Sequence, residues 1–164
     1  IHFMTGSDQS DDISMLGLRY HHPELAPKPF ATTLYMSNNL NELEKITAIL
    51  DELQTHCPLT DELKSSINLA LEEIVVNIIN YAYTDTKHHQ IAIYLSLFQN
   101  KLEFAVSDDG KAFDPTKAPD ADIDAPIEDR SIGGLGIFIA RQTMDEMEYI
   151  RVDETNILLM RKTI

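Results

Sequence analysis

The sequence is poor in cysteine and has no tryptophan: its 164 residues include one thiol, that of Cys57. A single thiol cannot close an internal disulfide, so packing and hydrogen bonds must hold the fold, as is usual in a reducing compartment. No apolar run approaches the roughly 18–20 residues that a membrane span requires. We therefore expect a cytoplasmic protein without a membrane partner.

Basic residues are also scarce, because 13 Lys and Arg stand against 27 Asp and Glu and give a net charge of −14. Affinity for DNA or RNA comes mainly from cations placed against phosphates, so direct nucleic-acid binding is not expected. A phosphate-bearing ligand would need locally placed donors and a metal ion to offset this acidic background.

The N-terminal part differs in character from the rest. The sequence starts without an initiator Met and without a charged-then-apolar signal pattern, so we expect a segment of a longer polypeptide. Three prolines within residues 23–29 prevent a helix and favour an extended linker. We therefore predict a preceding domain's tail at 1–20, a linker at 21–29 and one domain at 30–164.

Periodic patterns after the linker predict alternating groups of strands and helices. The strongest helix has Thr60 as its N-cap and acidic residues in its positively polarised first turn. The predicted elements are a strand at 30–36, helices at 40–55 and 60–83, strands at 89–97 and 101–107, a helix from 135 to 146, and strands at 149–152 and 157–162. Helices grouped against strands predict an α/β fold, a two-layer sandwich of a mixed sheet and helices.

The helix predicted at 60–83 carries Glu73 and Asn77 four residues apart, so both side chains project from one face. One interpretation is a solvated polar stripe on a half-buried helix. The other makes Glu73 a general base and Asn77 an oxygen ligand for Mg²⁺, which uses few protein oxygens beside nucleotide phosphates.

A second motif, Asp108-Asp109-Gly110, follows the strand predicted at 101–107. Asp-Gly sequences commonly do no more than end a strand in a turn. Alternatively, a buried carboxylate at Asp108 would accept a hydrogen bond from the exocyclic amine of adenine. Gly110 would then let the backbone approach the flat base.

A third motif, Gly133-Gly134-Leu135-Gly136, opens the helix predicted from 135. Free backbone N–H groups and the positive end of the helix dipole make such a start a ready anion site. A glycine-rich hinge without a ligand is the alternative. The missing lysine excludes a P-loop.

Together the three motifs occur in an order and spacing that resemble the Bergerat ATP-binding superfamily, which includes gyrase, heat-shock chaperones and histidine kinases. Within it, the sequence is most similar to the anti-sigma-factor serine/threonine kinases, over about residues 30–162. The segments that carry this resemblance are 72–83, 108–115, 133–137 and 144–149.

The resemblance implies a regulatory serine/threonine protein kinase of a bacterial partner-switching system, dependent on ATP and Mg²⁺. It would phosphorylate a STAS-domain anti-sigma antagonist, sequester a sigma factor, or do both. Glu73 would be catalytic and assist phosphoryl transfer, and Asn77 would hold the metal. The nucleotide would contact Asn77, Asp108, Gly110, Phe113, Arg130, Gly133, Gly134, Leu135 and Gly136.

The same resemblance predicts a mobile lid at 115–132, with Arg130 as its phosphate contact. A threonine often present in the family's last strand is matched by Thr155. Residues 11–20 resemble the last loop and strand of metal-dependent serine/threonine phosphatases of the stress- and sporulation-regulator kind, where Asp11 would match a metal-binding aspartate. The full protein would then join a phosphatase to a kinase.

The main alternative to a kinase is a catalytically weak module that binds ATP and sequesters a protein partner. Glu73 favours the kinase, because a sequestering domain needs no base at that position. A histidine-kinase catalytic domain is less suited, because no phospho-acceptor helix pair is visible. Exposed apolar residues on the helix at 40–55 would suit a homodimer.

Overall fold

The computed structural model describes residues 30–118 and 134–164 of the chain. The predicted phosphatase tail and linker lie outside the described residues, as does the lid from 119 onward. The described elements are β1 (Phe30–Ser37), the 3₁₀ turn η1 (Leu40–Glu42), α1 (Glu44–Gln54), α2 (Asp61–Tyr81), β2 (Gln90–Phe98), β3 (Lys101–Asp108), the 3₁₀ turn η2 (Pro115–Lys117), α3 (Gly134–Thr143), β4 (Glu146–Val152) and β5 (Thr155–Thr163).

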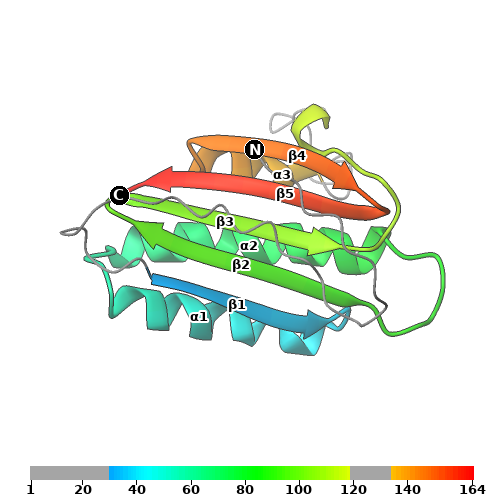
Figure 1. Cartoon of the computed structure of the whole chain (residues 1–164), viewed down its shortest axis with the longest axis horizontal. Coiled ribbons are helices and arrows are strands. Elements are labelled where there is room, and N and C mark those ends of the chain that lie inside the picture. The colour runs from blue at the N-terminus through cyan, green and yellow to red at the C-terminus, as the bar shows by residue number, and fades with distance from the viewer. Residues whose placement is uncertain (1–29, 119–133) are drawn as a thin grey trace, which may run out of the picture.

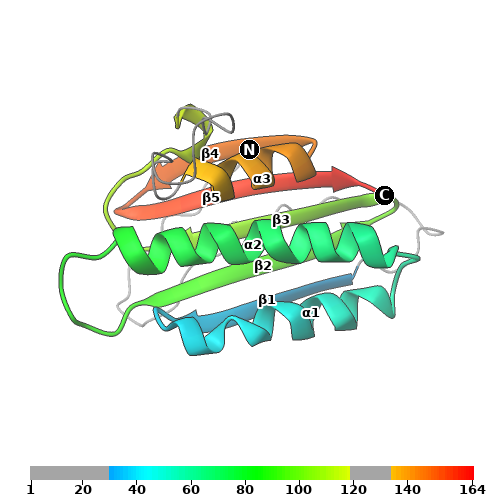
Figure 2. The same cartoon turned by 180° about the vertical axis from the view of Figure 1, so that it is seen from behind.

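The described strands form one sheet in the order β1-β2-β3-β5-β4, and α1, α2 and α3 cover the same face of it (Figures 1 and 2). The predicted two-layer α/β sandwich is confirmed. Every described pairing is antiparallel, so the expected mixed sheet is wrong. Two helices lie between β1 and β2, and each reverses the chain, whereas a single helical crossover would have produced a parallel pair.

The helix α2 begins and ends where local chemistry requires it. The Thr60 hydroxyl accepts a hydrogen bond from the Leu63 N–H at 3.2 Å, which satisfies one of the free donors of the first turn. At the other end the Ala82 N–H still donates to the Ile78 carbonyl, and the Ala82 carbonyl accepts from the Lys111 N–H at 2.9 Å. The end of α2 is therefore joined directly to the turn that follows β3.

The helix α3 is shorter than predicted, because it ends at Thr143 and Glu146 already belongs to β4. The Met144 N–H makes the last helical bond, to the Ala140 carbonyl. One residue later the Asp145 N–H donates instead to the Arg161 carbonyl of β5. Pairing with the sheet competes with the last helical turn here, and local apolar spacing does not reveal that competition.

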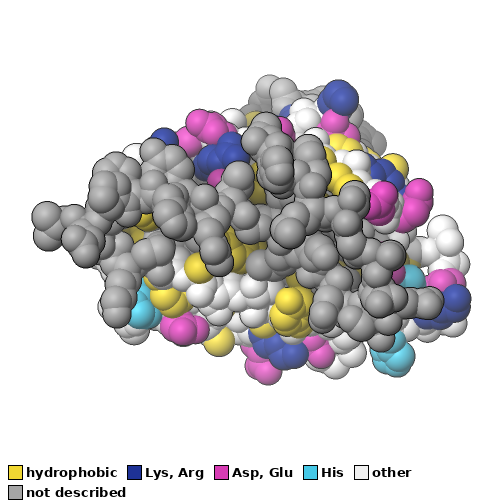
Figure 3. Space-filling model, in the orientation of Figure 1, with side chains coloured by type: hydrophobic (Ala, Val, Ile, Leu, Met, Phe, Trp, Pro, Cys, Tyr) yellow, Lys and Arg dark blue, Asp and Glu magenta, His cyan; other side chains and the backbone are white. Residues whose placement is uncertain are grey.

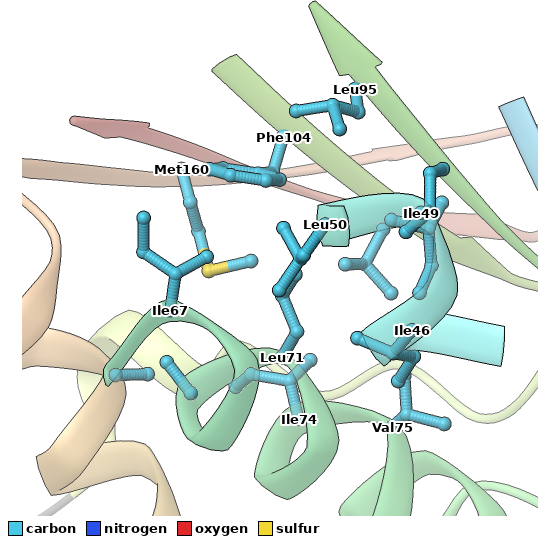
Figure 4. Close-up of a cluster of buried hydrophobic side chains, with 14 of the residues drawn as sticks. Ile46, Ile49, Leu50, Ile67, Leu71, Ile74, Val75, Leu95, Phe104 and Met160 are labelled. Atoms are coloured by element: carbon cyan, nitrogen blue, oxygen red, sulfur yellow. The ribbon is translucent and has the colours of Figure 1, made fainter. Parts of the chain in front are cut away.

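The core lies between the helices and the covered sheet face. Figure 4 shows Phe104 and Met160 of the sheet directed toward Leu50 of α1 and Leu71 of α2, all fully buried. Along β3 the buried positions alternate strictly and end at Asp108. Because side chains of a strand alternate between faces, the same pattern that buries Phe104 brings the Asp108 carboxylate to the inner face.

The opposite face of the sheet is mixed in character. Figure 3 views this side and shows hydrophobic side chains among acidic and basic ones. On this face Arg161 of β5 pairs with Glu103 of β3 at 2.8 Å, while Ile157 and Leu159 of β5 are half-buried. No helix among the described residues is long and apolar enough to cross a membrane.

Shortening a core side chain of α2 should destabilise the fold. Leu71 is fully buried, so Leu71→Ala should lower the free energy of unfolding by about 2–5 kcal/mol through lost burial and a residual cavity. Leu69→Ala is a matched control on the same helix, since Leu69 is 43% exposed and its truncation should change stability by only about 0.5 kcal/mol. Urea denaturation measures both, and equal losses would contradict the placement of the core.

Candidate functional site

The predicted site residues gather at one end of the two layers. Figure 2 shows the C-terminal end of α2, the start of α3, the end of β3 and the start of β5 at the same side of the molecule. The helices α2 and α3 lie side by side there and make extensive contact. Residues that the sequence places far apart therefore come together at this end.

Glu73 of α2 lies directly against Gly136 of α3. A Cβ atom at position 136 would overlap Glu73 Oε2 and come within 2.8 Å of Glu73 Cβ. Only a residue without a side chain permits this approach. The structure thus brings the acidic residue of the first motif to the glycines of the third.

Asn77 lies one helical turn beyond Glu73 on α2, and its side chain is half-buried. Its Nδ2 atom is buried and makes no hydrogen bond within the described part of the chain. A buried donor without a partner costs free energy and calls for an explanation, such as a ligand. A bound group that supplies acceptor oxygens would satisfy it.

Asp108 is buried, with 6% of the residue exposed. Its Oδ1 accepts hydrogen bonds from the Gly110 N–H at 2.8 Å and from Asn156 Nδ2 at 2.9 Å. Burial raises the pKa of this carboxyl, while the bonds from Asn156 and Gly110 act in the opposite direction. The second oxygen, Oδ2, has no recorded partner among the described residues, so it can accept from a ligand.

Gly110 closes the turn against the end of α2. A Cβ atom there would lie 2.5 Å from Ala82 Cβ and 2.9 Å from the Ala82 carbonyl oxygen. Those distances exclude any side chain without a shift of the backbone. The second motif is therefore fixed to the helix that carries the first.

The remaining predicted residues are only partly described. Phe113 is 51% exposed and takes no part in the core. Gly134 is the first residue of α3 and Leu135 the second, though the burial of these two positions lies outside the description. Arg130 and Gly133 fall in the undescribed segment. Their assignment to the nucleotide stays a prediction.

The sequence matches a known domain family. The profile described as "Histidine kinase-like ATPase domain" matches residues 36–162. The chain belongs to this family.

Several similar proteins carry the same name. The chain is 33% identical over 102 residues to "Serine-protein kinase RsbW" of Bacillus cereus strain AH820, and equally to that of Bacillus thuringiensis strain Al Hakam. The match covers 60% of this chain and 62% of each relative, so the chain spans less than two thirds of their length.

A solved structure has a similar fold. The structure of the RsbU and RsbW domains of Rv1364c from Mycobacterium tuberculosis superposes with a TM-score of 0.55, at 15% identity. The superposition covers 80% of this chain and 32% of that one.

In this ATPase domain the strand partner of Asp108 is Asn156, which sequence reasoning missed. The register places Asn156 of β5 opposite Asp108, whereas Thr155 pairs with Val152 at the adjoining turn. Thr155 thus stands at the β4–β5 turn, and its match to the family's last-strand threonine stays a prediction. Two-residue alternation backward from the buried Leu158 would have pointed to position 156.

Arg141 of α3 is a second residue that the sequence did not single out. Its Nη2 donates to the carbonyls of Pro115 and Ala118, both at 2.7 Å. Pro115 opens η2, where the predicted lid begins. Residues 115–118 are thus hydrogen-bonded to α3, the helix that begins at the glycine motif.

A cluster around His89 fixes the α2–β2 loop to the turn that contains Asp108. His89 Nε2 lies 2.8 Å from Asp85 Oδ1, and Nδ1 lies 3.0 Å from Asp109 Oδ1. The Tyr83 ring stacks on the imidazole with centroids 4.0 Å apart. Hydrogen bonds that the imidazole donates to Asp85 and then to Asp109 raise the pKa of His89, and the bond to His89 lowers the pKa of Asp85.

This cluster should make stability depend on pH. A histidine whose pKa is raised on folding stabilises fully below its unfolded value near 6.5, and the contribution is lost as pH rises through the folded value. The free energy of unfolding of the wild type should exceed that of His89→Gln most between about pH 3.8, the ordinary pKa of an Asp carboxyl, and about pH 6.5. The gain should shrink above that. Urea unfolding from about pH 5 to 9 measures it, and a constant difference would exclude the charged imidazole.

Proposed function

We propose that the chain is an ATP- and Mg²⁺-dependent serine/threonine protein kinase domain of a bacterial partner-switching system. The observation that carries this proposal is the contact of Glu73 with Gly136. It sets a carboxylate against the first turn of a helix, where N–H groups and the dipole favour phosphate. A base and a phosphate-binding element side by side are what transfer to a hydroxyl requires.

The nucleotide would enter between α2, α3 and the end of β3. Asp108 Oδ2 would accept from the adenine amine, and the backbone at Gly110 would lie along the base, where no Cβ intervenes. The N–H groups at 134 and 136 would donate to phosphate oxygens. All of these atoms lie near the C-terminal end of α2 and the start of α3.

Asn77 fits the metal role. Its amide oxygen is a hard ligand of the kind Mg²⁺ prefers, and its buried, unpartnered Nδ2 would donate to a phosphate or water oxygen. Bound Mg²⁺ would neutralise charge on the phosphates. No cluster of three or more His, Cys, Asp or Glu residues suited to a metal occurs in the described ranges. The metal would therefore depend on the nucleotide for most of its non-water ligands.

In the transfer step Glu73 would accept the proton of the incoming serine hydroxyl as that oxygen bonds to the γ-phosphorus and the β–γ bridging bond breaks. The helix α2 fixes the backbone of Glu73, and the absence of a side chain at Gly136 lets its carboxylate lie against α3. Positioning of this kind supplies much of the rate enhancement in phosphoryl transfer.

The protein substrate would be a STAS-domain antagonist of an anti-sigma factor, and a sigma factor would be a second partner. Similarity to proteins named serine-protein kinase RsbW supports this assignment. A homodimer through the surface of α1 belongs to the same proposal. The alternative function is an ATP-binding module that holds a partner with negligible catalysis, and the position of Glu73 favours the kinase over it.

Nucleotide binding should depend on Asp108. Asp108→Asn replaces an acceptor oxygen with a donor, so ATP affinity measured by calorimetry with Mg²⁺ should fall by about 1.5–3 kcal/mol, the range for a hydrogen bond to a charged group. Asp153→Asn is the control, because Asp153 is exposed in the β4–β5 turn with φ of 45°, a conformation that Asn tolerates. Wild type that binds no ATP at millimolar concentration would overturn the proposal.

Catalysis should depend on Glu73. Glu73→Gln keeps the size of the side chain against Gly136 but removes the base, so phosphorylation of a bound STAS partner should fall by roughly 10²–10⁴-fold with ATP affinity nearly unchanged. Glu72→Gln is the matched control, because the neighbouring Glu72 instead accepts from Asn68 at 2.7 Å.

The same assay separates the two candidate functions. Labelled ATP with STAS proteins from the same genome shows whether transfer occurs at all. Wild type that captures such a partner and never phosphorylates it would support the sequestering module. Equal rates in wild type and Glu73→Gln would leave a kinase whose base is another group.

A further inference from the structure

The side chain of Asn156 is held by contacts on both sides of its amide. Its Nδ2 lies 2.9 Å from Asp108 Oδ1 and 3.1 Å from the Lys111 carbonyl oxygen. Its Oδ1 accepts from the Tyr149 hydroxyl at 2.7 Å and from Arg151 Nη1 at 2.6 Å. Asn156 is 6% exposed, so water does not compete freely for these bonds.

The orientation of this amide follows from the chemistry of its neighbours. A guanidinium can only donate, so Arg151 requires the amide oxygen on its side. A flipped amide would set its NH₂ against the guanidinium and its oxygen against the Asp108 carboxylate and the Lys111 carbonyl, so the hydrogen bonds to these groups would be lost and replaced by repulsions. Arg151 on one side, and the acceptors Asp108 and Lys111 on the other, therefore determine which end of Asn156 meets Asp108. The Tyr149 hydroxyl, which can donate or accept, adds a hydrogen bond to the amide oxygen.

The same bonds distinguish the two oxygens of Asp108. Oδ1 accepts from Asn156 and from the Gly110 N–H, while Oδ2 has no recorded partner among the described residues. Arg151 also donates to the Gly110 carbonyl at 3.1 Å and so holds the turn that supplies the second donor. Asp108 thus presents one free acceptor oxygen in a fixed direction.

We propose that Tyr149 and Arg151 are positioning residues that set nucleobase specificity, by fixing the Asn156 amide so that Asp108 acts only as an acceptor toward the purine amino group. This inference rests on the proposed binding of ATP at this site. It assigns a role to β4, a strand on which no predicted site residue lies.

Loss of the amide donor would change what Asp108 can recognise. Burial raises the pKa of this carboxyl and the charge of Asp109 raises it further, whereas the Asn156 bond and the charge of Arg151 lower it. Among the neighbouring titratable groups, Tyr83 stays neutral, since burial and then the charge of Asp108 raise its pKa. Without Asn156 in place, Asp108 protonates more readily, and a protonated carboxyl donates to a purine carbonyl as well.

The test compares ATP with inosine triphosphate, in which a carbonyl replaces the amino group of adenine. In the double variant Tyr149→Phe/Arg151→Met the preference for ATP over inosine triphosphate should fall about tenfold or more, the effect of one lost hydrogen bond to a charged group. ATP affinity should also decline more steeply toward acidic pH in the double variant than in wild type, because protonation of Asp108 removes the acceptor.

Arg161→Met is the matched control, because Arg161 is also a sheet arginine with carboxylate partners but lies on the opposite face, paired with Glu103. It should leave both the nucleotide preference and the pH profile unchanged. If the double variant loses cooperative unfolding, Tyr149→Phe alone removes one hydroxyl and should still reduce the preference several-fold.

The outcomes separate the inference from the function on which it rests. Wild type that fails to bind ATP would defeat the proposed function itself. Wild type that prefers ATP, with variants that weaken both nucleotides equally and keep the wild-type pH profile, would reduce Tyr149 and Arg151 to structural residues and overturn the inference.

Discussion

The buried carboxylate of Asp108 imposes the constraint on which the rest of the site depends. A charge removed from water costs several kcal/mol unless hydrogen bonds replace its hydration. The Gly110 N–H supplies one bond only if the chain turns sharply after β3, and Asn156 supplies another only if β5 pairs in the observed register. The same turn packs closely against Ala82, where α2 ends.

Close packing then links this carboxylate to the other two motifs. The helix α2 carries Glu73 and Asn77 along one side and meets the Asp108 turn at its C-terminal end. The helix α3 can approach α2 closely because Gly136 has no side chain to oppose Glu73. The helix α2 thus holds the other two motifs beside its own, and the hydrophobic core behind α2 fixes where that helix lies.

Local pattern predicted most of the fold and several site residues. Apolar alternation placed β3 within a residue of its observed end, and capping chemistry at Thr60 placed the start of α2. The pairing direction of the strands and the early end of α3 were not predictable in this way. Both depend on hydrogen bonds between segments far apart in the chain, such as that from the Asp145 N–H to the Arg161 carbonyl.

By itself, the sequence determined the order of elements and the positions of the three motifs, because each follows from short-range periodicity or spacing, while the resemblance to the family supplied what those motifs mean. Only the tertiary structure decided which residues accompany them. Asn156 reaches Asp108 through the register of β5, and Tyr149 and Arg151 reach Asn156 through the position of β4. His89 meets Asp109 through the path of a loop. A one-residue change of register would reverse every side chain of β5, and nothing local to that strand specifies its partner.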